Sequence, residues 1–448
     1  MLKRKIDSYI QQYYTNSRNA LLITGARQIG KTYSIREFGK NYKSFVEINF
    51  VEQPMAAEQL RSARSSRDIL LRLSALTDKE LIPGETLIFF DEVQLCPEIV
   101  TAIKFLVDEG SYRYILSGSL LGVELKDLRS EPVGYMGVKE MYPLDFEEFV
   151  TNIGVSPHII STLRHAWETR SATDEVVHEK MMELFRLYLV VGGMPSAVNS
   201  YLQTNNLQKV ATVQQDILRL YRRDISQYDS QNKFAIEEIF NLIPPELNAA
   251  NKRFILKSLS EKARFSRYEN GFLWLQHAGV ALPVYNTEEP KVPLLLARSR
   301  NLFKLFQSDI GLLAAQYANG IQLKIIQGDP DINYGSIYEN AVAQELVAHG
   351  ITPYYYNNKK RGEVDFIIEI NGHVLPLEVK SGKDYTVHSA LRNLLNCEEY
   401  HLQEAVVFNN SNLRTVANIT YAPIYMVMFL QPTDDTPAYY KIDLSALQ

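Results

Sequence analysis

The chain has 448 residues, of which 46% are hydrophobic and 22% are charged, so it can form several ordinary domains. Its formal net charge of −5 excludes a uniformly basic surface, and any nucleic-acid contact must come from local patches. The longest apolar runs are too short for a membrane helix, and we expect no membrane-spanning segment. Two isolated cysteines and a start without an apolar signal segment indicate the cytoplasm.

A phosphate-binding pattern follows the apolar run at residues 20–24. Glycines let backbone N–H groups wrap around a phosphate, and the next helix directs its positive dipole end at the same anion. Lys31 would contact the β- and γ-phosphates of ATP or GTP, and Thr32 would hold Mg²⁺. The alternative is a glycine turn that binds nothing. The eight residues that fit GxxxxGK[ST] are Gly25, Ala26, Arg27, Gln28, Ile29, Gly30, Lys31 and Thr32.

A second apolar run, residues 86–90, ends in two acids. This pattern predicts a strand buried on both faces of a parallel sheet, with its carboxylates at the ligand-binding edge. Asp91 would hold Mg²⁺ through water. Glu92 would orient and polarise the water that attacks the γ-phosphate.

A third strand is predicted at residues 112–116 and ends in Ser117-Gly118-Ser119. A hydroxyl of Ser117 or Ser119 could sense the γ-phosphate, although a plain turn would have the same composition. Arg129, which follows, is the candidate for an arginine finger.

The order of these elements resembles the core of AAA+ ATPases. The chain also contains the segments GARQIGKT, IFFDEVQ, ILSGSLLG, PVGYMGVKEMYPLDFEEF, VGGMP, GEVDFII and LEVKSG. In these segments it resembles a prokaryotic family in which such a core is joined to a C-terminal domain of uncertain function related to restriction endonucleases. This resemblance implies a P-loop AAA+ core with a parallel sheet and a C-terminal α/β domain of the PD-(D/E)xK class.

We therefore expect an α/β multidomain protein with four parts. The AAA+ core covers residues 1–153, and the helical pattern that follows predicts a lid at 154–230. Three short helical segments and two apolar strands suggest a winged-helix-like part at 231–295. The restriction-endonuclease-like domain covers 296–448.

The winged-helix-like part contains a basic stretch, residues 252–267. Basic side chains of this kind can contact DNA phosphates. A solvated helix face or a protein-docking module would have the same composition. The stretch carries Lys252, Arg253, Lys257, Lys262, Arg264 and Arg267 against one acid, Glu261.

Two strands, residues 363–370 and 373–380, are separated by Asn371-Gly372, a strong hairpin signal. The turn fixes the register, so Asp365 should face Glu378 and Glu363 should face Lys380. Pro376, inside the second strand, indicates an edge position or a bulge.

Facing carboxylates repel each other by up to about 1 kcal/mol, and a divalent cation would reverse that sign. We expect Asp365, Glu378 and the Val379 carbonyl to bind a metal, with Lys380 stabilising charge. The helix before them places Glu339 where the nucleases that the chain resembles often supply one more acid. The alternative is a degenerate nuclease domain kept for binding or packing.

Other residue types give weaker signals. The histidines lack a zinc-ligand spacing and are expected to be structural. Tyr354-Tyr355-Tyr356 could stack on bases, but a strand of the C-terminal core is the favoured interpretation.

Two functions fit the sequence. The first is an ATPase that couples Mg-ATP binding and hydrolysis to a nuclease-like domain on DNA. The second is an ATP-dependent switch or scaffold, read by a partner protein or by other copies of the chain, with a catalytically silent C-terminal domain.

Overall fold

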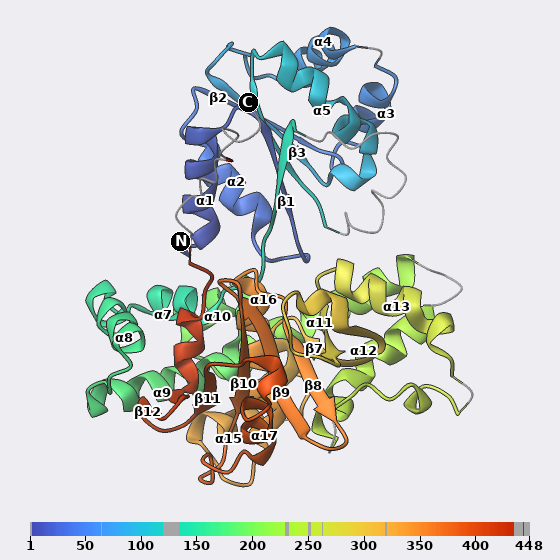
Figure 1. Cartoon of the computed structure of the whole chain (residues 1–448). Helices are drawn as coiled ribbons and strands as arrows, with labels where there is room; N and C mark the ends of the chain where they lie inside the picture. Colours follow the sequence, from blue (N-terminus) through green and yellow to red (C-terminus); the bar gives the residue numbers. More distant parts are fainter. Residues whose placement is uncertain are drawn as a thin grey trace.

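The computed structural model describes residues 2–63, 65–119, 134–228, 233–249, 252–261, 263–318, 320–433 and 442. Within them the chain forms two parts that pack against each other (Figure 1). The first, blue to cyan, is a parallel sheet with helices on both faces. The second, green to red, combines a group of helices with a larger sheet. One buried apolar cluster includes residues of both parts, for example Leu21 and Ile368.

The first sheet has the strand order β2-β3-β4-β1-β5, and all neighbouring strands are parallel. Parallel strands end at one edge, so the carboxyl ends of β3, β4 and β1 lie next to one another. The phosphate loop, the two acids and the serines follow these three strands, as the sequence predicts. The strands are β1 (Ala20–Thr24), β2 (Ser44–Asn49), β3 (Thr86–Asp91), β4 (Arg113–Ser117) and β5 (Met136–Glu140).

Alternate residues of these strands face two apolar cores, as the period of two in a β-strand requires. Leu21 and Leu87 pack on the side of α1 and α2, whereas Leu22 and Ile88 pack on the side of α3, α4 and α5. Burial on both faces explains why these strands are continuous apolar runs. The helices are α1 (Lys5–Asn16), α2 (Lys31–Gly39), α3 (Pro54–Arg61), α4 (Ser66–Leu76) and α5 (Pro97–Glu109).

A group of helices, α7 to α13, follows the first sheet. Local sequence signals determine where several of these helices begin. The side chains of Ser156 and Asp174 cap the N-termini of α8 and α9, and Pro195 is the first residue of α10. The VGGMP segment interrupts the helices between α9 and α10, as predicted. The bounds are α7 (Phe146–Ile153), α8 (Pro157–Thr169), α9 (Glu175–Val191), α10 (Pro195–Thr204), α11 (Leu207–Tyr228), α12 (Lys233–Asn248) and α13 (Phe265–His277).

The second sheet is mixed and has the strand order β12-β13-β11-β10-β9-β8-β6-β7. Strand β6 pairs with β7 on one side and with β8 on the other. The winged-helix expectation needs correction here, because β6 and β7 extend the C-terminal sheet instead of forming a separate wing. The strands are β6 (Ala281–Thr287), β7 (Arg298–Gln307), β8 (Tyr354–Asn358), β9 (Gly362–Ile370), β10 (His373–Val379), β11 (Ala405–Asn409), β12 (Arg414–Val416) and β13 (Ile419–Pro423).

The tyrosine run is part of a strand. Tyr354, Tyr355 and Tyr356 are buried in β8, so the strand interpretation is confirmed. The remaining helices of this part are α14 (Ile310–Ala314), α15 (Ile321–Gln327), α16 (Tyr334–Ala348) and α17 (Ser389–Leu395).

The hairpin register is confirmed. His373 pairs with Ile370 across the turn, and Leu377 pairs with Phe366. The edge position expected from Pro376 is wrong, because β10 pairs with β9 and β11. The pairs with β11 begin at Leu377, one residue later, so the proline does not interrupt them.

In the described residues, no single helix has the length and apolar character needed to cross a membrane. The pair α9 and α10, bent by 120° between them, passes that test only when both are taken together.

Candidate functional site

The phosphate loop connects β1 to α2 at the junction of the two parts. Gly25 and Gly30 have φ angles of 130° and 95°, which glycine adopts without strain. A Cβ atom on Gly25 would also lie 2.2 Å from the carbonyl oxygen of Met141. The glycines of the motif are therefore required by the backbone itself, and α2 begins at Lys31, within the motif.

The Lys31 side chain is folded into its own loop. Its Nζ donates hydrogen bonds to the carbonyl oxygens of Gly25 (2.8 Å) and Ala26 (2.7 Å), and the residue is 7% exposed. Burial lowers the pKa of Lys31 to about 8, although Glu92 and Asp91 act in the opposite direction. The ammonium is thus bound by neutral carbonyls, which phosphate oxygens could replace.

Asp91 lies at the centre of the polar groups at this edge of the sheet. Its carboxylate accepts hydrogen bonds from the hydroxyls of Thr32 (3.1 Å) and Ser117, and from the side-chain amide of Asn49 (3.1 Å). Burial raises the pKa of Asp91. The Thr32 hydroxyl and the Asp91 carboxylate are oxygen donors in direct contact, which fits a pair that would hold Mg²⁺.

Glu92 has the left-handed backbone conformation, with φ of 57°. Its carboxylate accepts hydrogen bonds from Gln94 and, at 3.4 Å, from the hydroxyl of Ser119. The site therefore includes Gln94 and Asn49, which sequence reasoning did not single out. The DEVQ order placed Gln94 close in sequence to the acids, and this was the available signal.

The loop is also held by residues far away in the sequence. Arg27 forms an ion pair with Asp224 of α11 at 2.6 Å, and the Tyr221 hydroxyl donates to the Arg27 carbonyl oxygen at 3.3 Å. On another side, Arg4 donates to the carbonyl oxygen of Ile29 at 2.9 Å. The phosphate loop therefore contacts the helical part of the chain directly.

The VGGMP segment forms a packing junction. A Cβ atom on Gly193 would lie 2.1 Å from the carbonyl oxygen of Leu144, which explains the glycine. The N–H of Gly193 donates to buried Asp309 at 2.6 Å. Burial raises the pKa of Asp309 to about 6, while hydrogen bonds from Gly193 and Leu312 oppose this shift.

The predicted C-terminal site contains an acid cluster bridged by lysines. The Nζ of Lys304, from β7, lies 2.8 Å from Glu363, 3.3 Å from Glu339 and 3.9 Å from Asp365. Lys252 binds the other oxygen of Glu339. Sequence reasoning placed neither Lys304 nor Lys252 here.

Asp365 and Glu378 are close enough to influence each other. Burial, followed by the charges of Glu339 and Glu378, raises the pKa of Asp365 well above its usual value. The N–H of Val379 donates to Asp365 at 2.9 Å, and Lys380 binds Glu378 at 2.6 Å. Lys380, which follows directly after β10, therefore pairs with the acid near the end of that strand.

The predicted ligands fit a metal poorly in this arrangement. No set of three His, Cys, Asp or Glu side chains in the described part of the chain has the geometry to hold a metal ion. Carboxylate oxygens of Glu339 and Asp365 are directed instead at the ammonium of Lys304. In this cluster, a lysine lies where the sequence predicted a divalent cation.

The basic stretch divides in two. Lys252 is directed inward to Glu339, whereas Lys257, Arg264 and Arg267 are exposed. Lys262 and the arginine-finger candidate Arg129 lie outside the described residues.

Comparison with family models assigns the first part of the chain. Residues 17–150 match a model described as AAA domain, and this part is an AAA-type P-loop ATPase domain. Two further models, both described as domains of unknown function, match residues 182–323 (DUF8612) and 334–426 (DUF4143). These descriptions do not identify the C-terminal part as restriction-endonuclease-like.

Solved structures resemble the chain at low identity. A Walker-type ATPase of Pyrococcus abyssi is 15% identical, with 70% of this chain and 96% of that chain covered and a TM-score of 0.44. The Aeropyrum pernix Orc1 protein in complex with DNA is 11% identical, with 74% and 93% covered and a TM-score of 0.30. The comparison with curated proteins gave no match.

Proposed function

We propose that the chain hydrolyses ATP with Mg²⁺ at the phosphate loop and transmits the nucleotide state to the helical and C-terminal parts. The observation that supports this most is the 3.1 Å contact between Thr32 and Asp91 at the edge of the sheet, beside Lys31. Thr32 and Asp91 would hold Mg²⁺, which would supply positive charge to offset the negative charge that develops on the phosphates.

The side chains would have separate roles. Lys31 would leave the carbonyls of its own loop and bind the β- and γ-phosphates. Glu92 would orient the attacking water and polarise it. Ser117, at the end of the middle strand β4, would report the γ-phosphate to Asp91, to which it already donates.

A pair of variants tests the metal role. Asp91→Asn and Thr32→Val should retain ATP binding but lose Mg²⁺-dependent turnover. Asp91→Asn removes the negative charge of the carboxylate, and Thr32→Val removes the hydroxyl oxygen. Steady-state ATPase assays with Mg²⁺ and with EDTA measure this. Full Mg²⁺-dependent turnover in both variants would refute the assignment.

The coupling route proposed here runs through Arg27 and Asp224. Arg27 belongs to the loop that must rearrange around phosphates, and Asp224 belongs to α11. The arginine is 35% exposed in its side chain and the aspartate 9%, so the pair is only partly screened by water. A shift of the loop on ATP binding would therefore move or release α11.

Hydrogen exchange can test this route. ATP should change the exchange rate of backbone amides near Asp224, and Asp224→Asn should reduce that change. Asp216→Asn is the matched control, because Asp216 is an exposed acid on the same helix that pairs with Arg219. An exchange pattern of α11 that ATP leaves unaltered would contradict the coupling.

A second candidate function is metal-dependent DNA cleavage at Asp365 and Glu378. One oxygen of Glu378 is buried without a hydrogen-bond partner, which favours an added cation. Exposed Lys257, Arg264 and Arg267 could contact phosphates. A Mg²⁺ or Mn²⁺ cleavage assay on linear, single-stranded and supercoiled DNA tests it, with Asp365→Asn as the control.

DNA binding can be measured apart from cleavage. Replacing Lys257 and Arg264 with alanine should weaken binding across sequences and flatten its salt dependence.

A partner protein or further copies of the chain could instead read the nucleotide state. The expected cytoplasmic location rests on Cys96 and Cys397, neither of which forms a disulfide.

A further inference from the structure

Lys304 is a buried cation that no part of the proposed ATPase mechanism uses. It lies on β7, which belongs to the segment matched at 182–323, whereas the acids around it come from α16 and β9 of the segment matched at 334–426. The side chains of Lys304 and Glu339 are 0% and 1% exposed. Such a charge is retained inside a protein only when partners compensate it.

The partners surround the Lys304 ammonium on several sides. Glu363 binds it at 2.8 Å and Glu339 at 3.3 Å, while Asp365 lies at 3.9 Å. The ring of Tyr355 faces it, with the ring centre 5.2 Å from Nζ. Three carboxylates around one positive charge resemble the surroundings of a bound metal ion.

The charges of the cluster nearly balance. Glu339, Glu363, Asp365 and Glu378 supply four carboxyl groups, and the ammonium groups come from Lys252, Lys304 and Lys380. One proton, shared among the four carboxyl groups, would make the cluster electrically neutral.

We infer that Lys304 is the resident cation of this cluster, taking the place of a divalent metal and joining the two segments that match different families. The inference is independent of ATP hydrolysis and excludes the second candidate function. Removal of the ammonium should then open a divalent cation site, because the carboxylate oxygens of Glu339 and Asp365 that face Lys304 would lose their resident cation.

Mn²⁺ titration of the full chain tests this directly. All proteins carry Asp91→Asn, which removes the metal ligand of the phosphate loop, and no nucleotide is added. The variants are Lys304→Met and the double variant Lys304→Met/Glu363→Gln. The double variant loses one charge of each sign, so it should fold even where the single variant does not.

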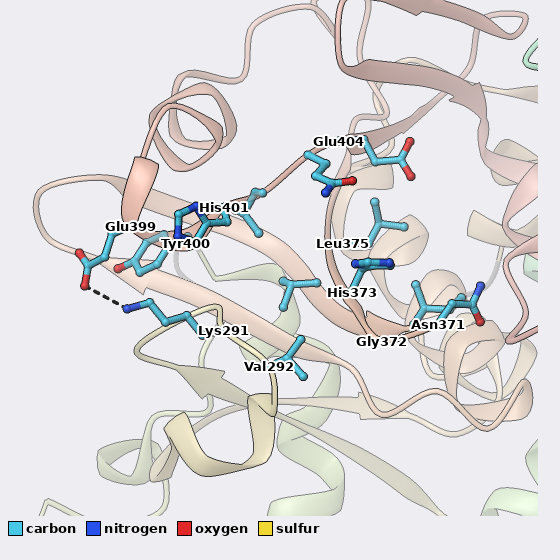
Figure 2. Close-up of a pocket in the computed structure, with 14 residues that line it drawn as sticks. Lys291, Val292, Asn371, Gly372, His373, Leu375, Glu399, Tyr400, His401 and Glu404 are labelled. Atoms are coloured by element: carbon cyan, nitrogen blue, oxygen red, sulfur yellow. Dashed lines mark hydrogen bonds and ion pairs between the residues drawn. The ribbon is translucent and has the colours of Figure 1, made fainter. Parts of the chain in front are cut away.

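Lys291→Met is the matched control. Figure 2 shows Lys291 paired with Glu399, at 3.1 Å, beside a cavity of about 370 Å³ near the hairpin turn at Asn371 and Gly372. Asp365 lies five residues before Ile370 on β9, roughly 17 Å along the strand from the turn. This lysine therefore lies in the same part of the chain, away from the acid cluster.

We expect no stoichiometric Mn²⁺ binding by calorimetry in the parent protein or in Lys291→Met. The double variant should bind one Mn²⁺ at least tenfold more tightly than the parent, and Asp365→Asn should remove the gain. Mn²⁺ should raise the melting temperature of the double variant alone. Parent binding that Asp365→Asn abolishes would overturn the inference, as would a folded double variant without any gain.

Discussion

Two buried lysines, Lys31 in the phosphate loop and Lys304 in the acid cluster, have opposite electrostatic surroundings. Lys31 is held by backbone carbonyls, and burial lowers its pKa to about 8. Burial also disfavours the charge of Lys304, but Glu339, Asp365 and Glu363 outweigh this and raise its pKa above the ordinary value. The chain thus contains one lysine that lacks an anion and one that already has several.

This difference indicates which site has room for a ligand. An anion that enters the phosphate loop would supply the charge partner that Lys31 lacks, so binding gains energy at that point. The Lys304 site is already neutralised, so a cation that enters it would have to compete with a covalently attached ammonium. The sequence motifs predict a ligand site at both places. The surrounding charges distinguish them, because only Lys31 lacks a charged partner that a ligand could supply.

The largest expected effect is on stability. Lys304→Met should lower the free energy of unfolding by about 3–5 kcal/mol, because it leaves buried carboxylates without a counter-charge. Lys291→Met, at a half-exposed pair, should change it by about 0.5 kcal/mol or less. Urea denaturation measures both values. Equal losses of unfolding free energy in the two variants would show that Lys304 does not compensate buried carboxylates.

The next effect concerns hydrolysis. Glu92→Gln should bind ATP normally but turn it over on the order of 100-fold more slowly, because the amide keeps the shape and loses the base. Single-turnover assays, together with a separate binding measurement, distinguish the two steps. Turnover at the wild-type rate would remove Glu92 from its proposed role.

Lys31→Ala should weaken ATP binding by roughly 10- to 150-fold, the range expected for loss of a charged hydrogen bond worth about 1.5–3 kcal/mol. Lys40→Ala is the control, since Lys40 is an exposed lysine just after α2 that pairs with Glu37. Equilibrium binding of a fluorescent ATP analogue provides the measurement. Equal affinities in the two variants would show that Lys31 does not contact the phosphates.

The smallest effect is a pH dependence of ATP affinity. Only protonated Lys31 binds phosphate well, and bound phosphate raises its pKa again. Affinity should therefore be flat below about pH 8 and fall by up to tenfold per pH unit above it. Calorimetry in two buffers should detect proton uptake at pH 9 and none from this group at pH 7. An ATP affinity that stays constant up to pH 10 would show that the pKa of Lys31 is not lowered, and that Lys31 does not differ from Lys304 in this respect.

The chemistry of the first part could be predicted from the sequence because its signals are local. Apolar runs of five residues, glycines at fixed spacing and acids at a strand end define β1, the loop and β3 without long-range information. The hairpin register followed for the same reason, since Asn371-Gly372 sets the turn. The pairs from His373–Ile370 to Leu377–Phe366 follow the predicted register, and Asp365 and Glu378 are the next residues along the two strands.

The partners of these residues were decided by the tertiary structure. Lys304 lies in the sequence RSRNLFKLFQ, where nothing indicates that its ammonium is buried. It reaches the acids only because β7 pairs with β6, β6 with β8, and β8 with β9. Asp224 reaches the phosphate loop only because α11 packs against the first part. Local sequence determines which groups exist and how each strand presents them, but charge balance depends on contacts between segments that are distant along the chain.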